Sequence, residues 1–113
     1  MSTATVAIKL SKLMENGGVC ALINDVQVAI FYLPQENPCV YAISNHDPVA
    51  KANVISRGIV GDINGELAVA SPMYKQHFSL SSGICLEDQS IQLPVYHARV
   101  DGDAAVISLQ APE

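Results

Sequence analysis

Charged and aromatic residues are scarce in this sequence of 113 residues. Only 15% of the residues are charged and 5% are aromatic, whereas 50% are hydrophobic. A chain this apolar is not intrinsically disordered, because it can bury enough surface to offset the entropy lost on folding. Positive charge is especially scarce: six Lys and Arg stand against eleven Asp and Glu, which gives a net charge of −5. This balance excludes the basic stripe of a nucleic-acid binder and argues against docking on anionic lipid.

Long apolar runs are missing as well. No stretch reaches the roughly 18 apolar residues of a membrane span. The first nine residues lack the basic start and the apolar core of a secretory signal. The three cysteines, Cys20, Cys39 and Cys85, form no CxxC pair, and an odd, scattered set suits thiols in a reducing cytosol better than a disulfide framework. We therefore expect a cytoplasmic protein with no membrane and no nucleic-acid partner.

The length is that of one domain, 1–113, and its turn signals predict an all-β fold. Asn-Gly, Asp-Gly and Pro-containing turns recur at short intervals between runs of β-branched and aromatic residues. The stretch 26–32 alternates with a period of two, which predicts one face in the core. Helix signals are limited to short turns at 10–14 and 50–54. The predicted strands are 26–32, 40–43, 59–61, 67–70, 91–93, 96–100 and 105–109.

Two segments, 42–48 and 69–86, carry a family resemblance. The second contains Ser71-Pro72 and Phe78 ahead of a Gly turn, and it resembles the second cluster-binding loop of Rieske proteins, Cys-Pro-x-His-Gly-x-x-Phe. The first follows a predicted strand, where the Cys-x-His loop of those proteins would lie. The resemblance covers most of the chain and implies a Rieske-like, antiparallel β-sandwich of small sheets with little helix.

The residues at the four cluster-ligand positions all differ from the Rieske pattern. A Rieske centre is held by two Cys thiolates and two His imidazoles. The resemblance places Asn45 and Ser71 at the cysteine positions, and Asp47 and Tyr74 at the histidine positions. An amide and a neutral hydroxyl are poor ligands for iron–sulfur iron, and Asp and Tyr do not reproduce a neutral imidazole pair. We therefore expect vestigial ligand positions that serve loop packing, with no cofactor and no metal in this chain.

A Rieske frame without its ligands resembles the small subunit of bacterial NADH-dependent assimilatory nitrite reductase. Arg57-Gly58 before a strand, Ser71-Pro72, and Leu86-Glu87-Asp88 look like that family in particular. The resemblance implies an accessory chain with no catalytic residue of its own. Its expected partner is the large catalytic subunit, which in that family carries FAD, an iron–sulfur cluster and sirohaem and reduces nitrite to ammonia with NADH.

A non-catalytic subunit must contact its partner through some surface. We expect this surface at the tip of the second loop, because Met and Tyr are favoured at interfaces. The candidate residues are Met73, Tyr74, Lys75 and Gln76. Two charged groups could speed the encounter with the partner. These are Arg57 with Lys51, and Glu87 with Asp88.

Four alternatives remain open on the sequence alone. His46, Asp47 and His77 offer two imidazoles and a carboxylate, the donor set of a mononuclear iron site, although both histidines flank the ligand positions. Cys85, beside a turn, is the best candidate for a reactive thiol, whereas Cys20 and Cys39 lie in apolar runs and are expected to be buried and inert. The chain could also be a Rieske-type electron carrier with unusual ligands, or an interaction module unrelated to nitrite.

Overall fold

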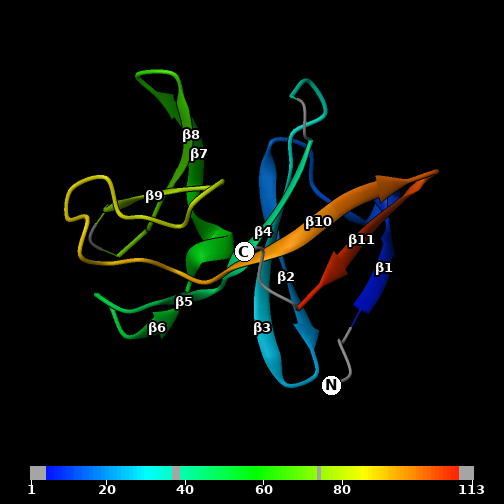
Figure 1. The fold of residues 1–113 in the computed structure, drawn as a ribbon, viewed down its shortest axis with the longest axis horizontal. Helices are drawn as coiled ribbons and strands as arrows, with labels where there is room; N and C mark the ends of the chain where they lie inside the picture. The colour runs from blue at the N-terminus through cyan, green and yellow to red at the C-terminus, as the bar shows by residue number, and fades with distance from the viewer. Residues whose placement is uncertain (1–4, 37–38, 74, 110–113) are drawn as a thin grey trace.

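The computed structural model describes residues 5–36, 39–73 and 75–109, which form eleven β-strands and two short 3-10 helices (Figure 1). The strands are β1 (Thr5–Lys9), β2 (Gly17–Ile23), β3 (Val26–Tyr32), β4 (Val40–Ser44), β5 (His46–Asp47), β6 (Ala52–Asn53), β7 (Ile59–Ile63), β8 (Glu66–Ala70), β9 (His77–Ser79), β10 (Val95–Asp101) and β11 (Ala104–Ser108). The 3-10 helices are η1 (Leu10–Lys12) and η2 (Ile55–Arg57). No helix among these residues is long and apolar enough to span a membrane.

Six strands make one antiparallel sheet in the order β1-β11-β10-β4-β3-β2. β10 joins its two halves, since it pairs with β11 over 97–101 and with β4 through Val95 and Tyr96. A second layer contains the three-stranded sheet β7-β8-β9 and the two-stranded ribbon β5-β6. Figure 1 shows this layer on one side of β2, β3 and β4, with β1 and β11 on the other.

The strand β3, which lies between β4 and β2, is buried on both faces. Val28 and Ile30 belong to one hydrophobic cluster, and Ala29 and Phe31 belong to the other. The expectation that only one face of this strand lies in the core is therefore wrong. The second layer covers the other face, which was expected to face solvent. The cluster that contains Ala29 and Phe31 also includes residues of the small sheet and of the loop after it, among them Val69, Phe78 and Leu80.

Two glycines allow close approaches of the backbone, one between β2 and η2 and one between the start of β7 and the end of β8. A Cβ atom at Gly18 of β2 would overlap the Ser56 carbonyl oxygen and the Phe31 ring, and one at Gly58 would overlap the Ala70 carbonyl oxygen. Only glycine has room at such positions. These contacts seat η2 against β2 and the start of β7 against the end of β8, so they position the loops of the candidate site.

The structure confirms the all-β class and most of the predicted strands, and it corrects four local expectations. The helical turn expected at 50–54 is wrong, because the chain turns earlier, over 48–51, then forms β6, and its 3-10 turn follows at Ile55–Arg57. The strand expected at 91–93 is reduced to an isolated bridge between Ile84 and Gln92. The strands β1 at 5–9 and β2 at 17–23 were not among the predicted strands.

Candidate functional site

The candidate site is formed by two loops, one after β4 and one after β8. Asn45, the first residue after β4, is 2% exposed and uses its whole amide. Its Nδ2 donates to Gln27 Oε1 (3.1 Å) and to the Asn53 carbonyl oxygen (3.2 Å), while its Oδ1 accepts the Ser56 N–H (2.7 Å). Its backbone N–H and carbonyl bond to Gln27 and Ile55. Asn45 thus fastens β3, β6 and η2 together.

The carboxylate of Asp47 connects the two loops. Asp47 is fully buried, and its Oδ1 accepts the backbone N–H groups of Val49 (2.8 Å) and Ala50 (3.1 Å). Its Oδ2 accepts the hydroxyl hydrogen of Ser71, which is 1% exposed at the end of β8. Two of the positions singled out from the sequence are therefore bonded to each other across the loops.

The two loops have the same turn geometry. The Lys51 N–H donates to the Asp47 carbonyl oxygen (2.7 Å), and the Lys75 N–H donates to the Ser71 carbonyl oxygen (2.9 Å). Both lysines are in the left-handed region, with φ of 56° and 59°. Each loop therefore closes four residues after its buried polar residue and ends on an exposed lysine.

The tip of the second loop contains the expected partner-binding residues. Met73 is 54% exposed and Lys75 is exposed, whereas Gln76 is half-buried. The Gln76 carbonyl accepts the Ser71 N–H (2.8 Å), but its side-chain Oε1 is buried and accepts no hydrogen bond from any residue that the structure describes. Tyr74, the fourth ligand position and a docking candidate, lies outside the described residues.

The two histidines near the loops have separate partners. His46 is exposed, and its Nδ1 bonds to Asn53 Oδ1 (3.0 Å). His77 begins β9, and its Nδ1 donates to Glu87 Oε2 (2.6 Å) while its backbone N–H donates to Glu87 Oε1 (2.8 Å). Within the described part of the chain, no group of three or more His, Cys, Asp or Glu side chains could hold a metal ion. The alternative of a mononuclear iron held by His46, Asp47 and His77 thus has no geometric support.

The His77–Glu87 pair shifts the titration of the carboxyl group. Partial burial raises the pKa of Glu87, but hydrogen bonds from the backbone and ring of His77, together with its charge, outweigh this and hold the pKa below its ordinary value. The pair also ties the loop after β9 to the first residue of that strand.

The structure corrects two expectations about the cysteines. Cys20 is exposed on β2 rather than buried, and its sulfur accepts a hydrogen bond from Asn45 Nδ2 (3.4 Å). Cys85 is buried, and burial raises the pKa of its thiol; the nearby Glu87 carboxylate raises it further, although backbone N–H groups lower it. A buried thiol with a raised pKa is a weak nucleophile, so Cys85 is not a reactive site. Cys39 is half-buried.

The donors at the ligand positions do not fit a Rieske cluster. The three described positions offer an amide, a carboxylate and a hydroxyl, whereas the cluster needs thiolates and imidazoles. All three side chains already make hydrogen bonds within the protein, and Asp47 and Ser71 contact each other where a cluster would separate the loops. These residues hold the two loops together through hydrogen bonds.

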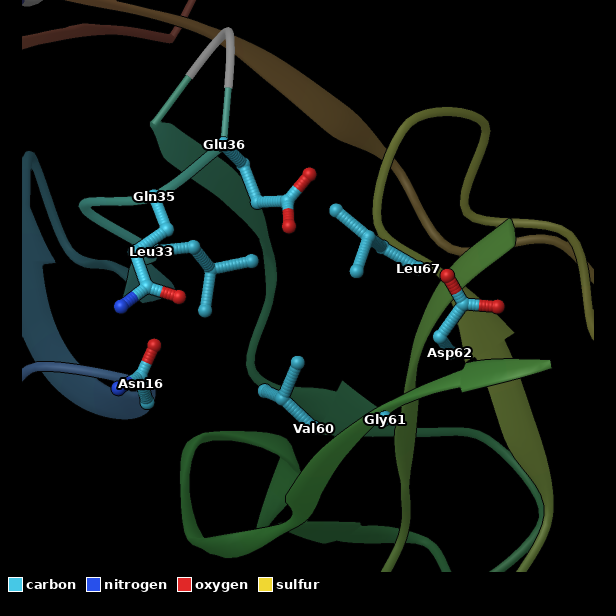
Figure 2. Close-up of a pocket in the computed structure, with 8 residues that line it drawn as sticks. All are labelled: Asn16, Leu33, Gln35, Glu36, Val60, Gly61, Asp62 and Leu67. Carbon is cyan, nitrogen blue, oxygen red and sulfur yellow. The ribbon is translucent and has the colours of Figure 1, made fainter. Parts of the chain in front are cut away.

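Two cavities lined by described residues lie away from these loops. One has a volume of about 240 Å³ and opens between the β3–β4 connection and the β7–β8 hairpin. Figure 2 shows Leu33, Val60 and Leu67 within it, and Glu36 and Asp62 on its two sides. A second cavity of about 470 Å³ shares Glu36, Asp62 and Leu67 with the first and adds Glu66. This end of the small sheet is therefore acidic, and neither cavity reaches Asn45, Asp47 or Ser71.

Sequence reasoning missed two features of this site. The first is the contact of Asn45 with Gln27 and Cys20, which lie on strands far away in the sequence. The second is Ile59, the first residue of β7, which is 78% exposed. A large apolar residue directly after Arg57-Gly58 was the only available signal, and it looked like an ordinary strand residue.

Comparisons with known proteins agree with the geometry. Residues 4–108 match the family profile of the Rieske-like [2Fe-2S] domain. The chain is 48% identical over 92 residues to the nitrite reductase (NADH) small subunit of Escherichia coli (strain K12), covering 81% of this chain and 84% of that protein. The solved structure of the E. coli protein NirD superposes with a TM-score of 0.84 at 41% identity, covering 95% of this chain and 97% of that one.

A different kind of relative matches over a shorter stretch. The chain is 39% identical over 74 residues, or 66% of its length, to the nitrite reductase [NAD(P)H] large subunit of Klebsiella oxytoca. The match covers only 7% of that large subunit. In that protein, a segment similar to this chain is part of the large subunit itself.

Proposed function

Because the chain belongs to the Rieske-like [2Fe-2S] domain family and, within it, to the nitrite reductase (NADH) small subunits, we propose that it is the small, cluster-free subunit of an NADH-dependent nitrite reductase. In this role it supports a large catalytic subunit that carries FAD, an iron–sulfur cluster and sirohaem. The complex reduces nitrite to ammonia in the cytoplasm, as part of nitrate assimilation. The observation that carries the proposal is the 48% identity over most of both chains.

The Klebsiella relative supports a lasting association with the large subunit. Two units that occur within one polypeptide in one organism are held at high effective concentration, which indicates that they work together when they are separate chains. The same reasoning favours an assembled reductase over an interaction module unrelated to nitrite.

The cluster-free part of the proposal follows from the donor set. Asn45 and Ser71 provide no thiolate, and Asp47 is a hard, anionic donor instead of a neutral imidazole. These side chains replace the cross-link that a cluster provides with direct hydrogen bonds between the loops. The chain therefore contributes binding and shape to the complex, whereas the redox steps belong to the large subunit.

The proposal is tested by purifying the large subunit with and without this chain. We expect the two to co-purify, and we expect loss of the small chain to lower the yield of loaded large subunit or its NADH-dependent nitrite turnover. Equal yield and equal turnover without the small chain would contradict the accessory role. A small chain that itself accepts electrons from NADH-reduced large subunit would support the electron-carrier alternative instead.

A further inference from the structure

The loops of the site form one end of the small sheet, here called the loop end, with the exposed residues Lys51, Arg57, Ile59, Met73 and Lys75. The register places them together. Ile59 pairs with Ala70, directly before Ser71, and Ser71 bonds to Asp47. The closing N–H groups of Lys51 and Lys75 bond to the carbonyls of Asp47 and Ser71.

The loop end exposes two large apolar side chains. Ile59 is 78% exposed and Met73 is 54% exposed. Single exposed apolar residues are ordinary, but two at the same end of a sheet, surrounded by charge, have the composition of an interface centre with a polar rim. Methionine adds a flexible side chain that adapts to a partner surface.

The loop end is rich in cations. Three of the six Lys and Arg residues, Lys51, Arg57 and Lys75, lie there, although the net charge is −5. None of the three forms an ion pair with a residue that the structure describes, whereas the carboxylate nearby, Glu87, is bonded to His77, the register partner of Ala70. Near the other end of the same sheet, Glu36 and Asp62 lie beside one cavity (Figure 2), and Glu66 lies beside the other. Cations without an ion-pair partner among the described residues therefore lie at the loops.

The bases of the two loops at the loop end are joined. The Asp47–Ser71 bond joins the two loops, and both closing lysines have positive φ values, which disfavour side chains with a Cβ atom. Asparagine or glycine would suit these turns better. Lysine at both positions instead places a charge on each loop.

We propose that the loop end docks on the large subunit, at a face where carboxylates surround an apolar depression that receives Ile59 and Met73. This inference rests on the proposed function and adds to it the docking surface and the chemistry of the partner. The cations Lys51, Arg57 and Lys75 steer the encounter and fix the orientation, and the two apolar side chains supply the buried centre. It extends the expectation from sequence, which placed the contact surface at Met73–Gln76 and named Arg57 with Lys51 as charges that speed the encounter. The structure adds Ile59 and places these groups at one end of the small sheet.

The test measures binding of full-length variants to the purified large subunit. In the loop-end charge variant, Lys51→Asn, Arg57→Gln and Lys75→Asn are combined, because Asn accepts a positive φ. The matched control combines Lys9→Gln, Lys12→Gln and Arg99→Gln, the other three cations, and therefore has the same net charge. We expect the loop-end variant to bind about tenfold or more weakly, and the control to bind like the unmodified chain, with affinity that falls as salt rises.

A second pair of variants tests the apolar centre. Ile59→Ser with Met73→Ser should weaken binding by about tenfold or more, whereas Leu22→Ser with Met14→Ser removes equally exposed apolar side chains elsewhere and should leave binding unchanged. Thermal melting verifies that each variant is folded. If the unmodified chain binds and both loop-end variants bind equally well, the docking surface is overturned and the proposed function stands. If the unmodified chain does not bind the large subunit at all, the proposed function itself fails.

Discussion

At the scale of single residues, hydrogen bonds of buried polar side chains hold the loops together. Asn45 and Asp47 are buried; Asn45 bonds the first loop to β3, β6 and η2, and the bond between Asp47 and Ser71 joins the two loops. Their position in facing loops could be predicted from the resemblance, because the spacing of the motif survives when its ligands change. Their partners could not, since Gln27 and Ser56 reach Asn45 only through the fold.

Replacing Asn45 should lower the free energy of unfolding. Asn45→Ala leaves the Ser56 N–H and the Asn53 carbonyl without their partner, which costs about 2–4 kcal/mol in the free energy of unfolding. Chemical denaturation measures the loss. His46→Ala, an exposed neighbour on the same loop, is the control and should change stability by less than about 1 kcal/mol. Equal effects at both positions would show that the Asn45 bonds contribute little.

The unpaired acceptor of Gln76 gives a prediction of opposite sign. Gln76→Met keeps the length of the side chain and removes a buried oxygen that has no described donor. We expect the free energy of unfolding to stay the same or rise by up to about 1 kcal/mol. A loss of stability on this scale would mean that Oε1 has a hydrogen-bond partner in solution.

The Glu87 carboxyl makes stability depend on pH. Because its pKa is lowered in the folded state, its contribution is fully present at neutral pH and is lost as the pH falls below the unfolded value of about 4.3. The pair with His77 is partly exposed, so the contribution is below about 1 kcal/mol. Thermal melting between neutral pH and pH 3 should show a smaller acid-dependent loss in Glu87→Gln. An unchanged acid profile would contradict the role given to His77.

At the scale of elements, the placement of β3 explains what sequence could and could not predict. The period of two in 26–32 identified the strand correctly, but periodicity shows alternation and not how many layers cover the sheet. Both faces are buried because the small sheet packs on one of them. The same limit applies to 50–54, where local signals favoured a helical turn and pairing of Ala52 with Asp47 made a strand.

Two nearby glycines test the close approach between the start of β7 and the end of β8. Gly58→Ala places a Cβ atom against the Ala70 carbonyl, directly before β7, so we expect a loss of about 2 kcal/mol or more in the free energy of unfolding. Gly61→Ala, within β7, is the control, because nothing lies within 4 Å of its Cβ position, and it should be neutral or slightly stabilising. Urea denaturation of both variants measures the difference. Similar stability for the two would show that β7 shifts easily relative to β8.

At the scale of the whole molecule, the chain is a Rieske-like frame whose loops are closed by hydrogen bonds and whose small sheet has Lys51, Arg57 and Lys75 at its loop end. The cavities lined by described residues lie near the other end, beside Glu36 and Asp62 and away from Asn45, Asp47 and Ser71. This arrangement suits a subunit that binds and orients a larger partner.

The most direct test of the proposal that this chain is a cluster-free subunit is the iron and acid-labile sulfide content of the folded chain, purified without oxygen. Its visible absorption spectrum is measured on the same sample. Asn45, Asp47 and Ser71 predict a colourless, folded protein without stoichiometric iron or sulfide that still binds the large subunit. A brown protein with two irons and two sulfides per chain would contradict this assignment.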